Sequence, residues 1–443
     1  ISLSQEERMN IQSMFNEMSL QKLEETYPDF PWLRYTNQLL SPFAAVNKSE
    51  LVSLNAPSYF QNLLILLKNS PQRTIVNYII WRIVASILQF FDDSSQQNPE
   101  KWKECMDFTK NRMGIALGFL YVNKYFDKAA KESAQKMTQN IKSNFDDLLK
   151  ENKWMDSNTR IHAIKKSKTM KFSIGYPDEL LDDKTVDAYY GDLSLEQDSF
   201  FENYQKLKIF GRKKAFGKLH QRVSKDWTSY AESTKINAEY LSEENSVYVP
   251  AGILQLSYYN ESRSDSLNYG AMGFIIGHEI SHAFDSKGRQ YDADGNLVNW
   301  WDDDTGKMFR DKAQCFVKQF NGYHVPEVNM TINGVNTLAE NIADNVGLKI
   351  SYRAYLKHYK SISDKKTIPG VDFKNRQLFW LSFANTFCGV MTLPRLRNYL
   401  LTNEHAYFKQ RVNGALSNIL SFADDFDCPM DTPMNPKNKC EVW

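Results

Sequence analysis

One short string, HEISH from His278 to His282, constrains the fold more than any other feature of the sequence. It lies in an apolar stretch from Leu267 to Phe284, whose apolar residues recur at helical spacing. Imidazoles four residues apart lie on one face of a helix, so both can reach one zinc ion, and Glu279 can reach a water on that ion. Such polar groups are costly to bury unless a metal or a partner satisfies them. The string therefore predicts a helix that carries a metal site, with a chance match as the alternative.

A catalytic zinc ion needs a third protein ligand and one open position. Glu340 and Asp344 lie four residues apart in a downstream helical segment, so their carboxylates share one face. Glu340 can then bind zinc while Asp344 orients a ligand imidazole. Alone, this pair reads as an acidic helix start; paired with the upstream string, a zinc site is the better interpretation. His405 and Arg411 have side chains that can stabilise an oxyanion, but by spacing alone the default reading is a surface histidine and arginine.

The composition indicates which classes of binding partner are not expected. The chain has 443 residues and is 42% hydrophobic, which allows a large core and, by length, two or three domains. Lys plus Arg (54) and Asp plus Glu (53) nearly balance, so neither nucleic acid nor an anionic membrane is expected as a partner. The best candidate for a membrane span, Tyr78 to Phe91, is interrupted by Arg82 and Gln89 and is too short to cross a bilayer.

Cysteines and glycosylation sequons bear on the compartment. The five cysteines are an odd number, which leaves at least one thiol free or paired outside the chain. Sequons begin at Asn47, Asn260 and Asn329, and together with the cysteines they favour a secreted environment. The chain starts neither with Met nor with a signal-like apolar segment, so we expect a processed product or a fragment of a longer polypeptide.

The pattern of apolar residues predicts a mainly helical chain. Residues 173–195 are read as a loop at a domain edge, and Lys235 to Pro250 as a strand or hairpin edge, because β-branched residues alternate there. The lysine-rich helices are expected to be exposed. Besides the stretch around HEISH, the segments expected to be helical are Ile75–Phe91, Cys105–Phe126, Lys131–Lys150, Thr159–Met170, Tyr204–Arg222, Asn336–Tyr355 and Asn375–Phe387.

Several strings in a fixed order resemble the neprilysin and endothelin-converting enzyme family of zinc metallopeptidases. They are VPAGILQ at 249–255, LNYGAMG at 267–273, GHEISHAFD at 277–285, GRQYDADGN at 288–296, AENIAD at 339–344, RVNGALSN at 411–418 and the terminal CEVW. The resemblance covers nearly the whole chain and is densest from Asn237 onward. It implies a zinc-dependent endopeptidase of the gluzincin group, with peptides as substrates and one zinc ion per chain.

The resemblance also assigns catalytic roles to individual residues. Glu279 would be the general base for a zinc-activated water, and Asp344 would hold the imidazole of His278. His405 would stabilise the oxyanion. The zinc ligands would be His278, His282 and Glu340.

A substrate site follows from the same resemblance. Asn237 and Ala238 would hold the substrate backbone as an added strand, and Arg411 would bind the carbonyl after the scissile bond. An apolar pocket would take the residue after that bond, which implies cleavage on the amino side of hydrophobic residues. This pocket would be lined by Ile253, Tyr258, Phe274, Ile275 and Phe387.

The fold and the disulfides are implied in the same way. A thermolysin-like catalytic domain with a small sheet would occupy residues 201–443. Residues 1–200 would supply helices both to that domain and to a cap, and would contribute the domain linkers. Cys315 would pair with Cys440. The other cysteines would link the chain to an N-terminal region of the same precursor, namely Cys105, Cys388 and Cys428. An extracellular or cell-surface ectodomain is therefore expected, and a homodimer is compatible with the sequence.

Two points leave alternatives open. Glu239 stands where the family usually has an aromatic residue after Asn237 and Ala238, so the substrate preference along that strand is undecided. A catalytically inactive binding or scaffold member of the same fold is the second class of function, although every expected catalytic residue type is present. A zinc enzyme of other chemistry, such as an aminopeptidase, is disfavoured because no signature for a substrate amine is evident.

Overall fold

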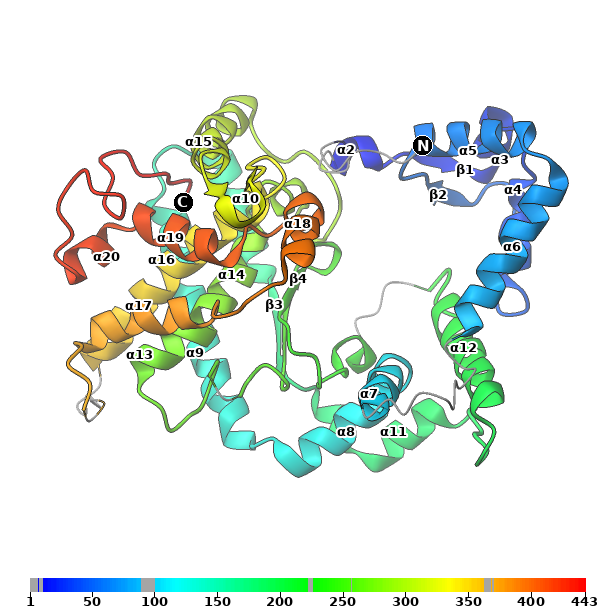
Figure 1. Cartoon of the computed structure of the whole chain (residues 1–443), viewed down its shortest axis with the longest axis horizontal. Coiled ribbons are helices and arrows are strands. Elements are labelled where there is room, and N and C mark those ends of the chain that lie inside the picture. Colours follow the sequence, from blue (N-terminus) through cyan, green and yellow to red (C-terminus); the bar gives the residue numbers. More distant parts are fainter. Residues whose placement is uncertain are drawn as a thin grey trace. The chain divides into compact units, whose positions relative to one another are not determined.

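The computed structural model of the chain describes residues 7, 11–88, 100–221, 226–255, 257–361, 368 and 370–443. Helices dominate these residues and the sheets are small (Figure 1), so the predicted mainly α fold is confirmed. The chain forms two compact units. The first comprises Ile1–Leu117 and Asp182–Asp226, and the second comprises Gly118–Leu181 and Trp227–Trp443.

The first unit contains a two-stranded sheet and helices around a small core. β1 (Glu17–Ser19) pairs antiparallel with β2 (Leu51–Ser53). One cluster of buried apolar residues consists of Leu20, Leu23, Trp32 and Leu54. Val186, Leu207 and Phe210 of the same unit are also buried. The helices are α2 (Ile11–Met14), α3 (Leu20–Thr26), α4 (Trp32–Leu40), α5 (Pro57–Asn69), α6 (Gln72–Ile87), α7 (Lys101–Arg112), α11 (Asp183–Tyr190) and α12 (Phe200–Phe216).

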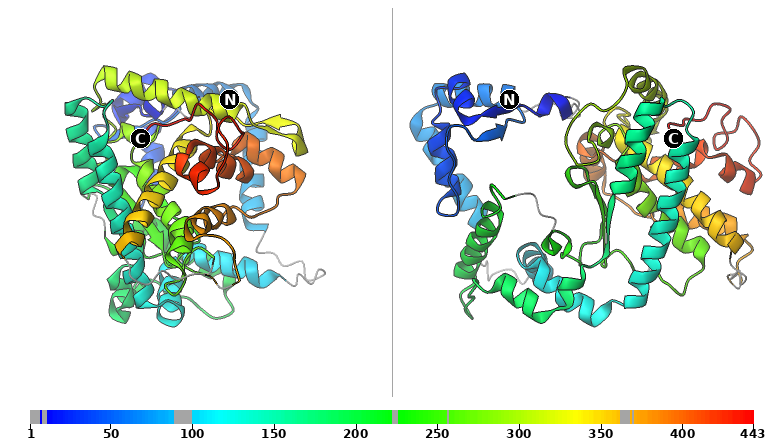
Figure 2. Two further views of the ribbon diagram at one scale, coloured as in Figure 1. Left: turned by 90° about the vertical axis from the view of Figure 1, so that its left-hand side faces the viewer. Right: turned by 180° about the vertical axis from the view of Figure 1, so that it is seen from behind.

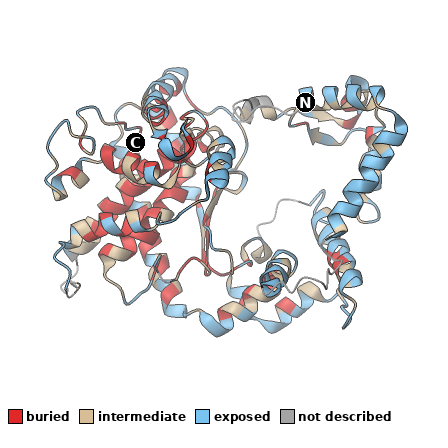
Figure 3. Ribbon diagram, viewed as in Figure 1, coloured by how far each residue is buried: buried red, intermediate tan, exposed pale blue. Residues whose placement is uncertain are grey.

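Two apolar segments differ from the sequence prediction. α6 begins at Gln72, earlier than expected, and none of its described residues is buried (Figure 3). The part of the expected helix beyond Leu88 lies outside the described residues. The expected helix Cys105–Phe126 is two helices, because Met113 ends α7 and α8 (Gly114–Tyr125) follows. Within the described parts of the chain, no helix is both long and apolar enough to cross a membrane.

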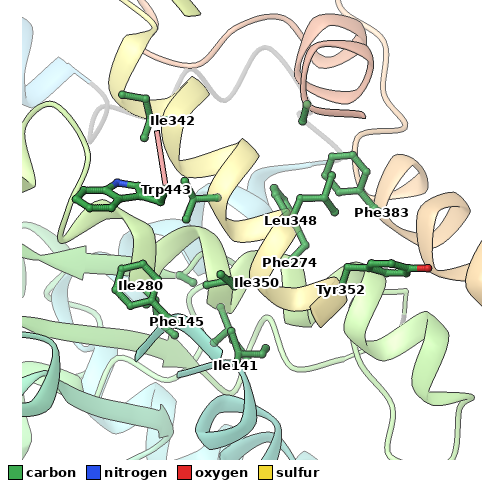
Figure 4. Close-up of a cluster of buried hydrophobic side chains, with 14 of the residues drawn as sticks. Ile141, Phe145, Phe274, Ile280, Ile342, Leu348, Ile350, Tyr352, Phe383 and Trp443 are labelled. Atoms are coloured by element: carbon green, nitrogen blue, oxygen red, sulfur yellow. The ribbon is translucent and has the colours of Figure 1, made fainter. Parts of the chain in front are cut away.

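The second unit is built around α14 (Phe274–His282) and α16 (Leu338–Ser361), which pack closely against each other. Apolar side chains from several helices fill the space around this contact (Figure 4), among them Ile141, Phe145, Ile280, Ile342 and Leu348. The other helices are α9 (Lys128–Glu151), α10 (Ser157–Thr169), α13 (Asp265–Asn268), α15 (Asp303–Asn321), α17 (Asn375–Asn385), α18 (Leu393–Thr402), α19 (Phe408–Asn418) and α20 (Leu420–Asp425).

The two units do not divide at a single boundary between residues 200 and 201, and each contains residues from both sides of it. α9 and α10 precede that boundary, yet both belong to the second unit, where they lie side by side (Figure 2, right). α9 packs against α14 and α16 through residues such as Ile141 and Phe145, which are fully buried. An amphipathic helix belongs to the unit whose core its apolar face covers. The sequence position of the helix does not show which core that is.

A three-stranded sheet lies in the second unit. Its order is β3-β5-β4, formed by Lys171–Gly175, Ser246–Pro250 and Glu239–Leu241. β3 runs parallel to β5, and β4 runs antiparallel to β5 and forms an edge of the described sheet. The strands predicted within Lys235–Pro250 are confirmed. The expectation of a loop over 173–195 is wrong, because β3 and α11 both occupy part of it.

Short elements complete the second unit. β6 (His324–Val325) pairs antiparallel with β7 (Met330–Thr331). The single-turn helices are η2 (Asp178–Leu181), η3 (Trp227–Tyr230), η4 (Ser242–Glu244), η5 (Tyr269–Gly273), η6 (Gly288–Gln290) and η7 (Pro326–Val328).

The N-termini of α10 and α15 cap each other. Asp156 accepts a hydrogen bond from Thr159 N in its own first turn, and Asp302 accepts one from Thr305 N. Across the contact, Asp156 N donates to Thr305 Oγ1 at 3.2 Å, and Asp302 N donates to Thr159 Oγ1 at 3.1 Å. Both threonines are buried. The reciprocal bonds satisfy helix-end groups and join the two helices.

One disulfide is present, between Cys315 of α15 and Cys440, with Cα atoms 5.5 Å apart. This pairing agrees with the one that the resemblance implies. Among the described residues, Cys105, Cys388 and Cys428 form no disulfide, and the first two are exposed. Their linkage to an N-terminal region stays a prediction.

Candidate metal centre and active site

Two glycines set the distance between α14 and α16. A Cβ atom on Gly277 would lie 2.5 Å from the carbonyl oxygen of Gly347, and one on Gly347 would lie 2.4 Å from the backbone nitrogen of His278. A side chain at either position would clash with backbone, so glycine permits the close approach of the two helices. The contact places HEISH, on α14, against the start of α16, which carries Glu340 and Asp344. The helix predicted around HEISH is confirmed as α13, η5 and α14 in succession.

The three predicted ligands converge at this contact. The Nε2 atoms of His278 and His282 lie 2.9 Å apart. Oε2 of Glu340 lies 3.2 Å from Nε2 of His278 and 3.7 Å from Nε2 of His282. His278 and Glu340 are buried and His282 is mostly so. Two imidazole nitrogens and a carboxylate oxygen therefore face one point.

This donor set fits a zinc ion. Glu340 Oε2 is buried and makes no hydrogen bond of good geometry to any described residue, although imidazole nitrogens surround it. An ionised carboxylate oxygen without such a partner is costly to bury, and a cation between it and the imidazoles would remove that cost. Two histidines and a glutamate are a donor set of catalytic zinc sites, which leave one position for water or substrate.

Neighbouring charges keep the carboxylate ionised. Burial opposes the charge on Glu340, but the imidazoles of His282, His278 and His405 outweigh it and hold the pKa of Glu340 well below its usual range. Burial also opposes the charge on His282, whereas the carboxylates of Glu340 and Asp285 raise its pKa to about 10.

Each of these two imidazoles also contacts a carboxylate through its Nδ1 atom. Nδ1 of His278 lies 2.9 Å from Oδ1 of Asp344, the contact that the resemblance implies. Nδ1 of His282 lies 2.6 Å from Oδ2 of Asp285, whose other oxygen accepts from the backbone N–H groups of Lys287 and Gly288, both at 2.7 Å. Such carboxylates orient a ligand imidazole and increase its basicity.

Sequence reasoning missed the role of Asp285. The available signal was its position three residues after His282, within the string GHEISHAFD. That spacing suits a contact across one helical turn. α14 ends at His282, however, and the carboxylate is held by the turn that follows, which the helical pattern does not reveal.

Lys166 of α10 stabilises this turn through hydrogen bonds to its backbone. Its Nζ donates to three backbone carbonyls, those of Ala283 at 2.8 Å, Gly288 at 2.7 Å and Tyr291 at 2.7 Å. The side chain is 1% exposed, so the expectation that the lysine-rich helices are exposed is wrong at this position. Burial lowers the pKa of Lys166 to about 7, with Asp285 opposing the shift. These carbonyls follow the last turn of α14, and those of Gly288 and Tyr291 also accept hydrogen bonds from Tyr291 N and Trp300 Nε1.

A pocket of about 380 Å³ opens beside the metal centre. His278, Glu279 and His405 line it, and His405 Nε2 lies 3.0 Å from Oε2 of Glu340. The structure brings the predicted substrate-binding residues to the same pocket, namely Asn237, Ala238, Ile253, Tyr258, Phe274, Ile275, Phe387 and Arg411. Residues that the sequence did not single out for it also line the pocket, namely Ile236, Thr386, Cys388, Gly389 and Phe408.

Arg411 lines the pocket and also binds Asp344. Its guanidinium donates two hydrogen bonds to Asp344, at 2.8 and 2.5 Å, and lies over the ring of Phe387. Burial opposes the charge on Asp344, but Arg411 and His278 outweigh it and lower the pKa of Asp344 to about 2. Asp344 therefore joins Arg411 to His278, one of the predicted metal ligands.

Comparisons with known proteins identify the family of the chain. Models of peptidase family M13 match residues 1–177 and 237–442. The chain is 39% identical to neprilysin-2 of Drosophila melanogaster, over 100% of this chain and 61% of that protein. It is 34% identical to endothelin-converting enzyme 1 of Rattus norvegicus, over 100% of this chain and 60% of that protein. The chain thus spans about three fifths of the length of these relatives.

A solved structure supports the fold. The crystal structure of Mycobacterium tuberculosis zinc metalloprotease ZMP1 in complex with an inhibitor matches with a TM-score of 0.87 and 24% identity, over 100% of this chain and 68% of that chain. At that identity the likeness is one of fold. The two family models, in order, cover most of the chain and confirm the resemblance to neprilysin and endothelin-converting enzyme: this chain belongs to peptidase family M13.

Proposed function

We propose that this chain carries the catalytic centre of a zinc-dependent endopeptidase that cleaves peptides on the amino side of hydrophobic residues. The observation that carries the proposal is the convergence of His278, His282 and Glu340 beside Glu279, at the mouth of an apolar pocket. Membership of peptidase family M13 supports the same reaction class.

His278, His282 and Glu340 would hold the zinc ion. Zinc, when bound, lowers the pKa of a water ligand to about 7 and polarises a carbonyl group. The orientation of the ligands would depend on Asp344 behind His278 and on Asp285 behind His282. Removal of such supporting carboxylates typically weakens metal binding by about 10- to 100-fold.

Glu279 is the proposed general base. It is buried next to the ligands and lines the pocket, so its carboxylate is placed to take a proton from the attacking water and to pass it to the leaving amine. His405 is partly exposed on the other side of Glu340, where it can donate a hydrogen bond to the oxyanion.

The substrate would bind along β4. Asn237 and Ala238 line the pocket just before this edge strand, so an extended peptide can pair beside them. The apolar residues of the pocket, with Phe274 and Phe387 at its wall, would take the side chain after the scissile bond. Arg411 would bind the following carbonyl while Asp344 holds its guanidinium.

We also propose an extracellular or cell-surface location. Asn47, Asn260 and Asn329 are all exposed, as glycosylation requires. The disulfide between Cys315 and Cys440 fits an oxidising compartment. Pairing with an N-terminal region through Cys105, Cys388 and Cys428 is part of this proposal, and a homodimer is compatible with it.

The test is cleavage of an internally quenched peptide with a single Phe in mid-sequence, using the full-length protein. We expect cleavage before Phe, loss of at least about 1,000-fold in kcat for Glu279→Gln with zinc content unchanged, and loss in a zinc chelator that added zinc reverses. Glu261→Gln, an exposed position of the same residue type, is the matched control. One bound zinc ion per chain without cleavage would instead favour an inactive binding protein of the same fold.

A further inference from the structure

The edge strand β4 carries a carboxylate next to the catalytic pocket. Glu239 is the first residue of β4 and follows Asn237 and Ala238, which line the pocket. Its side chain is 38% exposed, so it is accessible to a ligand. β4 pairs on one side with β5, and in the described sheet its other edge has no strand partner.

Glu239 faces the side of the sheet opposite to the core. Successive residues in a strand point to opposite faces. Ala238 belongs to the apolar core, and so does Val247 on β5. Glu239 is in register with Tyr248, whose ring packs on Tyr230 outside that core cluster. A residue directly opposite in an antiparallel pair lies on the same face, with Cβ atoms about 5 Å apart.

The ion-pair cluster that contains Glu239 carries a net negative charge. Lys235 Nζ lies 3.2 Å from Glu232 Oε2 and 3.5 Å from Glu239 Oε1, and all three side chains are partly exposed. Two carboxylates and one ammonium leave one net negative charge. The two carboxylates raise the pKa of Lys235 although its partial burial opposes them, so the lysine is charged at neutral pH.

The position along the strand decides which part of a substrate meets Glu239. On this segment the pocket is lined by Ile236, Asn237 and Ala238, and Glu239 lies beyond them. In the proposed function the pocket takes the residue that follows the scissile bond. A peptide that pairs antiparallel to β4 then places a residue that precedes the bond opposite Glu239.

We infer that Glu239 is a specificity-determining residue that favours Lys or Arg one or two positions before the scissile bond. The inference rests on the proposed function and names the substrate class: peptides with a basic residue just ahead of the cleaved hydrophobic residue. Exposed pairs of opposite charge are weak, so the effect is a preference of about two- to fivefold and not an absolute requirement.

The test compares quenched peptides that share one Phe and differ only at the two preceding positions, which hold Gln, Lys or Glu in turn. With the zinc-loaded full-length protein we expect kcat/KM for the Lys peptide to exceed that for the Gln peptide about two- to fivefold, and the Glu peptide to be the poorest. The preference should fall as ionic strength rises.

Three variants test whether Glu239 on β4 causes the preference for the Lys peptide. Glu239→Gln should bring the ratio of Lys to Gln peptide to about one, and Lys235→Gln should raise it by removing the competing ammonium. Glu243→Gln, an exposed carboxylate just past β4, is the matched control and should leave the ratio unchanged. Zinc content and thermal unfolding of each variant establish that it is folded.

The outcomes separate the two claims. Equal cleavage of the three peptides, or a preference that persists in Glu239→Gln, would overturn the inference and leave the proposed function intact. Absence of cleavage for every peptide by the zinc-loaded wild-type protein would overturn the proposed function and this inference with it.

Discussion

The two units use helical glycine in opposite ways. Gly347 lies within α16 of the second unit, where an added Cβ would lie 2.4 Å from a backbone atom of α14. Gly211 lies within α12 of the first unit, and an added Cβ there would meet no described atom within 4 Å. In the sequence both are single glycines inside a helical pattern. The comparison shows that packing, and not helix propensity, decides what such a glycine contributes.

The hydrophobic cores of the two units also differ in size. The second unit buries a large set of apolar residues around α14 and α16. The first unit buries fewer, with Leu20, Leu23, Trp32 and Leu54 in one cluster and others such as Leu207 and Phe210 on α12. α6 is rich in apolar residues, yet Ile79, Ile80 and Trp81 are each more than half exposed. Exposed apolar surface of this extent is typical of a face that binds another part of a protein.

The largest contrast is expected from one substitution made in both units. Gly347→Ala should lower the free energy of unfolding by more than about 3 kcal/mol, because the new methyl group meets backbone that cannot move aside. Gly211→Ala should raise it by up to about 1 kcal/mol, because alanine favours a helix more than glycine does. Urea unfolding followed by circular dichroism measures both. A stable Gly347→Ala protein that still binds zinc would contradict the account of the helix contact.

Periodicity could predict much of the site. The residue spacings within HEISH and ENIAD are local, so His278 with His282, and Glu340 with Asp344, were correctly placed on shared helix faces. The contact between the two helices depends on Gly277 meeting Gly347, which are 70 residues apart in the chain, and no local pattern encodes it.

Other features depended on tertiary context. Lys166 was expected at the surface because lysine-rich helices usually face solvent, yet the three carbonyls around it satisfy its ammonium group in the interior. The break at Met113 was missed because the apolar residues continue on both sides of it. The specific disulfide came from family resemblance, since five cysteines allow many pairings.

A second pair of substitutions tests the difference between the cores. Ile342→Ala should cost about 3 kcal/mol of stability, because Ile342 is fully buried beside the metal ligands and its loss leaves a cavity. Ile80→Ala should cost less than about 0.5 kcal/mol, because this residue is 53% exposed. The midpoint of urea unfolding reports each change. A cost above about 2 kcal/mol for Ile80→Ala would show that another part of the protein covers α6.

α10 carries a buried lysine, Lys166, next to an exposed one, Lys165. Lys166→Met keeps the length of the side chain but removes three hydrogen bonds to backbone carbonyls, so we expect a loss of about 2 kcal/mol in stability. The turn that carries Asp285 should loosen, which weakens zinc binding by about tenfold. Zinc titration with a competing chelator measures that affinity. Lys165→Met, at a neighbouring exposed lysine, is the control, and equal effects at both positions would contradict the role of Lys166.

The smallest effect is expected at the reciprocal caps of the second unit. Asp156→Ala removes the acceptor for the first turn of α10 and for Thr305, which should cost about 1 kcal/mol at neutral pH. Partial burial opposes the charge on Asp156, but hydrogen bonds from Thr159, Thr305 and Asn158 outweigh it and lower its pKa to about 2. An unfolded aspartate has a pKa near 3.9.

The sign of the pH dependence follows from these two pKa values. Because the folded-state pKa is the lower one, this contribution is present above about pH 4 and is lost as the pH falls through about 2. The difference in thermal midpoint between wild type and Asp156→Ala should therefore shrink over that interval. Asp182 caps α11 in the first unit by accepting from Thr185 N of its own helix, without a cross-helix partner of this kind among the described residues. Asp182→Ala should therefore have the smaller effect at every pH. A larger effect at Asp182 than at Asp156 would mean that the cross-helix bonds to Thr305 add no stability to the second unit.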